Sequence, residues 1–179
     1  EAKNYLDSAF MNKGKFESNN ISGMMHYIAG IYYSDKSLME QAHENYYQAA
    51  EYFNRNEMKP AILTEIYYDL SIIYSMWQDD EGLHELSEAM KDLPVDFPFQ
   101  QILKWTIKAK YFYALYQNEH RVDLLDSVTK YNQEAFKVYT STENPYDVGY
   151  VISDNYLHQA IVYSEAGKIQ EAETCFEKG

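Results

Sequence analysis

Small and aromatic residues recur along this chain at spacings that fit one face of an α-helix. In each good copy, a small residue precedes an aromatic one by three positions, and a small, aromatic, small set follows on the next stretch. Small residues let two helices approach closely, and the aromatics fill the space between successive pairs, so the pattern predicts stacked antiparallel helix pairs. The two best copies are Gly30, Tyr33, Ala42, Tyr46, Ala49 and Ala160, Tyr163, Ala172, Phe176, Gly179. Gly30 and Ala160 are expected at close helix contacts, and Tyr33 and Tyr163 are expected to be largely buried.

Breaks in this pattern divide the chain into expected helices. Gly14, the stretch Lys59-Pro60 and the stretch Asn144-Pro145 interrupt it, and proline is well tolerated in the first turn of a helix. The run Asp79 to Gly82 predicts a turn whose acids favour the dipole of the helix that follows. The expected helices are 1–12, 21–35, 38–54, 60–77, 81–91, 98–117, 121–140, 145–166 and 169–179.

The composition agrees with an all-α fold. Among 179 residues there are only 7 glycines and 4 prolines, which argues against a turn-rich β fold. Hydrophobic residues make up 46% of the chain, enough for a packed core, and the 19 tyrosines combine an apolar ring with a hydroxyl that reaches water. Such residues suit a thin repeat protein, in which few side chains lie far from solvent.

The net charge of −13 narrows the classes of partner. It repels phosphates and anionic lipids, so we expect no direct nucleic-acid binding by this segment. The sequence has no run of 18 apolar residues, so we also expect no membrane insertion by this segment. The single Cys175 cannot form an internal disulfide, which leaves the compartment open between the cytoplasm and the bacterial periplasm.

No motif in the sequence predicts a metal, a cofactor or a catalytic centre. The pair His84-Glu85 begins like a zinc helix, but Glu88 stands where the second histidine is needed. The chain has no glycine-rich loop for phosphates, and the acids before Gly82 are contiguous rather than alternating as in a calcium loop. We therefore expect a protein that is not an enzyme.

The recurring pattern resembles that of the tetratricopeptide repeat (TPR) family, over nearly the whole chain. The resemblance implies a single domain, 1–179, that forms a right-handed solenoid of stacked helical hairpins. The first and last full units match best. In the third unit Ala109 and Phe112 can be aligned with the pattern, but an alignment shifted by one helical turn fits nearly as well. The implied divisions are a partial unit at 1–20 and units at about 21–56, 57–95, 96–143 and 144–179.

The resemblance also implies a binding groove, lined by the first helix of each pair. Isoleucine stands at Ile31, Ile72 and Ile161, where TPR domains that clamp a peptide carboxylate carry asparagine, so a carboxylate clamp is not expected. The expected partner is a peptide or protein segment with apolar anchors and some positive charge. The alternative is that these side chains pack against neighbouring helices. The implied groove residues are Met24, Tyr27, Ile31, Tyr68, Ile72, Thr106, Lys110, Tyr113, Leu157 and Ile161, and the same mapping adds Ser34, Asp35, Glu65, Ser75, Met76, Leu103, Ala114, Asp154, Ser164 and Glu165.

Two functions follow from these expectations. The first is a non-catalytic protein–protein interaction scaffold. The alternative is a sensory or regulatory TPR region of a larger bacterial signalling protein or transcriptional regulator, because the pattern starts and stops in mid-repeat. In that case the end helices should expose apolar strips, and the isolated segment should self-associate through them. The strips are carried by Tyr5, Leu6, Ala9 and Phe10 at one end and by Ile169, Ala172, Cys175 and Phe176 at the other.

Overall fold

The computed structural model of the chain describes residues 2–12, 19–54, 60–142 and 149–179. These residues form α-helices joined by short turns, and none of them lies in a β-strand. The all-α prediction is therefore confirmed, and so are the expected helices within a few residues at each end. The breaks at Gly14 and at Asn144-Pro145 lie outside the described residues. The helices are α1 (Ala2–Met11), α2 (Asn19–Asp35), α3 (Met39–Asn54), α4 (Pro60–Trp77), α5 (Asp80–Asp92), α6 (Pro98–Glu119), α7 (Asp123–Thr140), α8 (Gly149–Glu165) and α9 (Ile169–Phe176).

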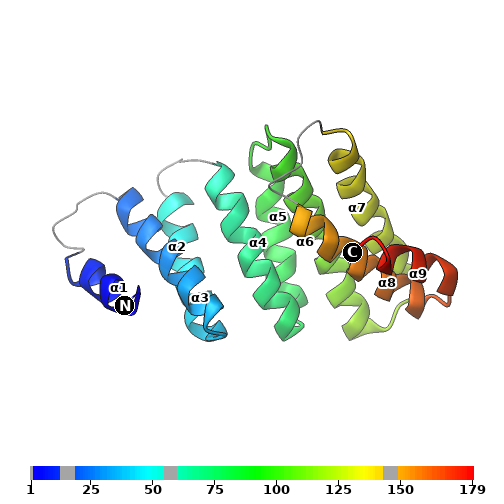
Figure 1. Cartoon of the computed structure of the whole chain (residues 1–179), viewed down its shortest axis with the longest axis horizontal. Coiled ribbons are helices and arrows are strands. Elements are labelled where there is room, and N and C mark those ends of the chain that lie inside the picture. The colour runs from blue at the N-terminus through cyan, green and yellow to red at the C-terminus, as the bar shows by residue number, and fades with distance from the viewer. Residues whose placement is uncertain (1, 13–18, 55–59, 143–148) are drawn as a thin grey trace. The chain divides into compact units, whose positions relative to one another are not determined.

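The chain divides into two compact units, Glu1–Ile73 and Tyr74–Gly179. The first unit contains α1, α2, α3 and most of α4, and within it α2 packs against α3. The second unit contains the last turn of α4 and the helices α5 to α9. Within it α6 packs against both α5 and α7, and α8 packs against both α7 and α9 (Figure 1). Helices that follow one another in sequence thus form hairpins in each unit.

The same turn ends the helices α2, α4 and α8. In each turn a tyrosine carbonyl accepts a hydrogen bond from the backbone N–H five residues later, at Tyr33 (2.9 Å), Tyr74 (2.9 Å) and Tyr163 (2.8 Å). The residue before that N–H adopts the left-handed conformation, which is the common way to end a helix. It allows a second helix to begin after two or three residues. The left-handed residues are Ser37, Gln78 and Gly167, with φ of 57°, 56° and 73°.

The turn after α6 corrects the predicted register of the third unit. Its left-handed residue is His120, with φ of 55°, and the His120 N–H donates to the Tyr116 carbonyl at 2.7 Å. His120 follows Tyr116 by four positions, as Ser37 follows Tyr33. The equivalent of Tyr33 is therefore Tyr116 and not Phe112. The predicted alignment was one turn too early, and the shifted alternative holds, because the helix end and not the aromatic spacing fixes the register.

Gly30 marks the closest approach of α2 to α3. A Cβ atom added there would lie 2.5 Å from Cδ1 of Tyr46, whose side chain is only 3% exposed. The predicted close contact at Gly30 is thus confirmed. Tyr33 and Tyr163, which were predicted to be largely buried, lie near a helix end and are partly buried. Tyr46, in the middle of α3, fills the interhelical space instead.

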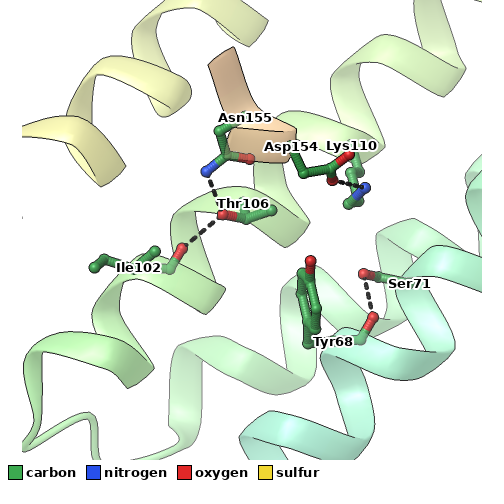
Figure 2. Close-up of polar contacts among 7 residues, drawn as sticks. All are labelled: Tyr68, Ser71, Ile102, Thr106, Lys110, Asp154 and Asn155. Carbon is green, nitrogen blue, oxygen red and sulfur yellow. Dashed lines mark hydrogen bonds and ion pairs between the residues drawn. The ribbon is translucent and has the colours of Figure 1, made fainter. Parts of the chain in front are cut away.

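Two buried amides on α8 hold this helix against α6 and α7. Asn155 donates to Oγ1 of Thr106 on α6 at 2.8 Å, and Thr106 in turn donates to the Ile102 carbonyl at 2.9 Å (Figure 2). One turn later, Gln159 accepts from Asn132 of α7 at 2.9 Å and donates to Thr129 at the same distance. Both amides are almost fully buried. A buried polar group without a hydrogen-bond partner costs free energy. These bonds therefore favour one rotation of α8 about its axis.

Substitution of Gly30 by alanine tests the close approach of α2 and α3. Gly30→Ala forces the new Cβ into the buried Tyr46 ring, so we expect the free energy of unfolding to fall by about 1–3 kcal/mol. Urea unfolding monitored by circular dichroism measures the change. Gly149→Ala is the matched control, because an added Cβ there meets nothing within 4 Å and should not destabilise the protein. Equal midpoints for Gly30→Ala and the wild type would contradict the packing of α2 on α3.

Substitution of Thr106 by valine tests the bond between α6 and α8. Thr106→Val keeps the shape but leaves the buried Asn155 amide without its acceptor, which should cost about 1–3 kcal/mol of unfolding free energy. Thr174→Val is the control, since Thr174 makes the same bond to the carbonyl four residues earlier (2.9 Å) but is exposed. Its effect should stay within about 0.5 kcal/mol. Equal losses of unfolding free energy in the two variants would show that the hydrogen bond between Asn155 and Thr106 does not stabilise the fold.

Candidate functional site

A pocket of about 230 Å³ lies in the second unit, between α6, α8 and the end of α4. Four of the predicted groove residues meet in it, namely Lys110 and Tyr113 from α6 and Leu157 and Ile161 from α8. Leucine and isoleucine give the pocket an apolar wall, and both are exposed, at 38% and 49%. The remaining lining residues are Ser75, Gln78, Ala114, Gln117, Asp154 and His158.

An ion pair forms one side of this pocket. Nζ of Lys110 lies 3.1 Å from Oδ2 of Asp154 (Figure 2). The Lys110 side chain is only 13% exposed, whereas that of Asp154 is 50% exposed. An ammonium group carries three donors and a carboxylate carries several acceptor sites, so each partner can bind a further group. The pair thus offers one donor and one acceptor at the edge of an apolar surface.

Two aromatic side chains of the pocket are uncharged near neutral pH. The rings of Tyr113 and His158 meet edge to face, with centroids 4.5 Å apart. Burial, followed by the charge of Glu165 and a 3.3 Å hydrogen bond to it, raises the pKa of Tyr113 to about 12. Burial, followed by the charge of Lys110, lowers the pKa of His158 to about 3. Neither group gains or loses a proton near pH 7, so the ion pair supplies the charge on the pocket wall.

Two predicted groove residues are inaccessible. Thr106 is fully buried and is the acceptor for Asn155. In the corrected register it corresponds to Gly23 and Thr64, which are buried as well, so its assignment to the groove followed from the one-turn error. Tyr68 is 3% exposed, and its carbonyl accepts from Oγ of Ser71 at 2.6 Å (Figure 2). We remove both residues from the candidate surface.

The corrected register also explains a residue that the prediction missed. A shift of one turn moves the implied groove positions of α6 onto Ile107, Lys110, Ala114, Gln117 and Asn118. Lys110, Ala114 and Gln117 line the pocket, whereas Ile107 is fully buried. Gln117 could have been found in the sequence by testing the shifted alignment. His158 could not have been found in this way. The pattern on α8 needed no shift, and only the packing of the helices turns the His158 ring toward Tyr113.

The remaining groove candidates belong to the first unit. Met24, Ile31 and Ile72 are exposed, at 37%, 40% and 37%. Tyr27 is half-buried, and its hydroxyl donates to Oε2 of Glu65 at 3.2 Å. Burial is the largest cause that raises the pKa of Tyr27, followed by the charges of Asp69 and Glu65. Tyr27 therefore remains a neutral hydrogen-bond donor.

Asp69 is an unusual carboxyl group in this unit. It lies one turn after Glu65 on α4 and hydrogen-bonds the hydroxyl of Tyr46. Burial, followed by the charge of Glu65, raises its pKa to about 7, although the bond from Tyr46 acts to lower it. The ion pairs of the described residues include neither carboxylate. Asp69 therefore exchanges its proton near physiological pH.

Two further apolar pockets lie beside the first and last helices. One, of about 380 Å³, lies between α1 and α2, where Tyr5 is 78% exposed. The other, of about 540 Å³, lies between α8 and α9, where Ile169 and Phe176 are 55% and 69% exposed. The predicted exposure of apolar side chains on the end helices is confirmed for Tyr5, Ile169 and Phe176. It is wrong for Leu6, which is buried, and Phe10 is only partly exposed.

A metal site and a membrane span are two features that the described ranges could carry. No cluster of three or more His, Cys, Asp and Glu side chains there is arranged to hold a metal ion. No described helix has the length and hydropathy needed to cross a bilayer. Cys175 is half-buried, and burial raises the pKa of its thiol, which lowers its thiolate content and reactivity.

Comparison with known proteins places the chain by its fold. No protein-family model matches the sequence, and no curated protein sequence matches it. Its structure is similar to the crystal structure of BtubC (BKLC) from P. vanneervenii, with a TM-score of 0.68 over 97% of this chain and 68% of that one. The two sequences are 16% identical, so the likeness concerns the fold. The chain is thus an all-helical protein of packed helical hairpins.

The raised pKa of Asp69 predicts how stability depends on pH. A folded-state pKa above the unfolded value of about 3.9 means that the folded chain holds more protons between about pH 4 and pH 7. Unfolding free energy should therefore fall as pH rises through that window, by about 2 kcal/mol between pH 5 and pH 8 from this group. Asp69→Asn should remove this fall and be more stable than the wild type at pH 8.

Urea unfolding at pH 5 and pH 8 provides the measurement. The control is Asp96→Asn, which removes the same charge from an exposed loop position. That variant should keep the wild-type difference between the two pH values. If Asp69→Asn also keeps it, the Asp69 carboxyl is not the group responsible.

Proposed function

We propose that this chain is a non-catalytic protein–protein interaction scaffold that binds a peptide or protein segment in a groove of a TPR-like, right-handed solenoid. The observation that carries the proposal is the pocket of the second unit. Lys110, Tyr113, Leu157 and Ile161 were selected from the sequence as groove residues, and they line one cavity although α6 and α8 are separated by all of α7.

The chemistry of this pocket suits a peptide. Leu157, Ile161 and Ala114 can bury an apolar side chain, which supplies affinity through the hydrophobic effect. The Lys110 ammonium can donate to a peptide carbonyl and the Asp154 carboxylate can accept from a peptide N–H. This pairing recognises main chain and not a particular terminal group, which fits the expectation from the sequence that the groove is not a carboxylate clamp.

The titration behaviour of the pocket favours binding over catalysis. General acids and bases work best with a pKa near the working pH. His158 and Tyr113 have pKa values of about 3 and about 12, far below and far above neutrality. Both serve as rigid aromatic surface, which is a property of protein-binding sites.

Selection from a random peptide library displayed on phage, with the whole chain as bait, tests the proposal. Chemically synthesised winners should bind with micromolar affinity by fluorescence anisotropy. Ile161→Asp should weaken them by about tenfold or more, because it places a charge in the apolar wall. Ile161 is 49% exposed, so the variant should fold normally by circular dichroism.

Ile21→Asp is the matched control, since Ile21 is similarly exposed (41%) but lies on α2 in the other unit. It should leave the affinity within about twofold of the wild type. Amide chemical shifts in NMR spectra should change at Tyr113, Leu157 and Ile161 when peptide is added. A library that yields no binder, or binders equally sensitive to both variants, would reject the groove as the binding site.

A further inference from the structure

The pocket between α8 and α9 is a trough with two apolar walls. Leu157 and Ile161 lie one turn apart on α8, and Ile169 and Phe176 line the opposite wall on α9. All four side chains are exposed, by 38% to 69%, in a cavity of about 540 Å³. A contiguous apolar surface of this kind on a soluble protein marks an interaction site.

The charges along this trough have one sign. Glu173 on α9 and Glu177, four residues later just after the end of α9, both line it. The two lysines that flank α9 in the sequence place their ammonium groups over tyrosine rings. Lys168 lies over the ring of Tyr163, and Lys178 lies over the ring of Tyr156. No ion pair of the described residues involves either glutamate. The trough therefore joins an apolar floor to an acidic edge without a neutralising cation.

Each wall of the trough is a row of side chains against which a third helix can pack. Side chains four positions apart form ridges on a helix, and the ridges of one helix pack into the groove between rows of another. The trough is bounded by such a row on α8 and by a second row on α9, formed by Ile169, Ala172 and Phe176. A helix with an apolar stripe can lay that stripe between the two rows, and lysine or arginine beside the stripe would then meet Glu173 and Glu177.

We propose that the α8–α9 trough binds an amphipathic helix of a partner protein whose apolar stripe is flanked by lysine or arginine. The inference rests on the proposed function, because Leu157 and Ile161 line both this trough and the neighbouring peptide pocket. It adds the conformation and the charge of the partner, which the pocket beside α6 does not specify.

Two fluorescently labelled helical peptides test the proposal on the whole chain. One is a short amphipathic helix of leucine and lysine, and the other is its twin with glutamate in place of every lysine. The lysine peptide should bind at low salt with micromolar affinity, and the glutamate twin should bind at least about tenfold more weakly. Higher salt should weaken only the lysine peptide.

Variants separate the trough from the general negative charge of the protein. Glu173→Gln/Glu177→Gln should weaken the lysine peptide about tenfold. The control is Glu40→Gln/Glu44→Gln, which removes the same charge at the same spacing from exposed positions on α3. It should change the affinity by less than about twofold. Phe176→Ser should weaken the peptide as well, since that side chain is 69% exposed and can be truncated without unfolding the protein.

Each result that would contradict the proposed partner can be told apart from the others. Equal binding of both peptides, or equal losses in the two double glutamine variants, would overturn the assigned partner chemistry and leave the peptide groove standing. Binding of neither peptide would also overturn it. If light scattering shows a dimer that Phe176→Ser dissociates, the trough holds a second copy of the chain and not a basic helix. Failure of the proposed function itself would appear separately, as insensitivity of library peptides to Ile161→Asp.

Discussion

The backbone turn that ends the first helix of each hairpin is the constraint on which the rest of this structure depends. A left-handed residue closes the helix, and a carbonyl near its end accepts from a backbone N–H beyond the turn. The next helix must then return along the first within a few residues. Once the turn is fixed, the positions of the side chains that face the partner helix follow. This explains why Gly30 must be small and why Tyr46 fills the space beside it.

The hairpin turns alone do not set the geometry of the pocket beside α6, which also depends on the buried amides of α8. Asn155 and Gln159 bond to α6 and α7, on the two sides of α8. Their bonds fix the rotation of α8, and that rotation turns Asp154 and Leu157 toward the pocket. Apolar packing tolerates small rotations, whereas buried hydrogen bonds do not, because an unpaired amide in a core is costly. The geometry of the pocket therefore depends on polar contacts behind it.

Three regions of the molecule differ in charge. In the pocket beside α6, Lys110 and Asp154 neutralise each other and leave a surface suited to main chain. In the α8–α9 trough the carboxylates of Glu173 and Glu177 stand without a cation, which favours a basic partner. In the first unit, Asp69 is partly buried beside Glu65 and holds its proton to about pH 7. One acidic chain thus carries a neutral, an anionic and a proton-exchanging region.

The sequence by itself determined the helical class, the helix positions and the close contact at Gly30, because these depend on local spacing and residue size. It also selected Leu157 and Ile161, which line the pocket beside α6, since the last unit keeps the pattern closely. Only the tertiary structure decided the register of the third unit, where no small residue marks the helix contact and the turn at His120 sets the alignment. The same one-turn difference moved Thr106 from a surface position into the core, where it bonds α8. Spacing along one helix is a local property, but burial depends on the helices packed around it.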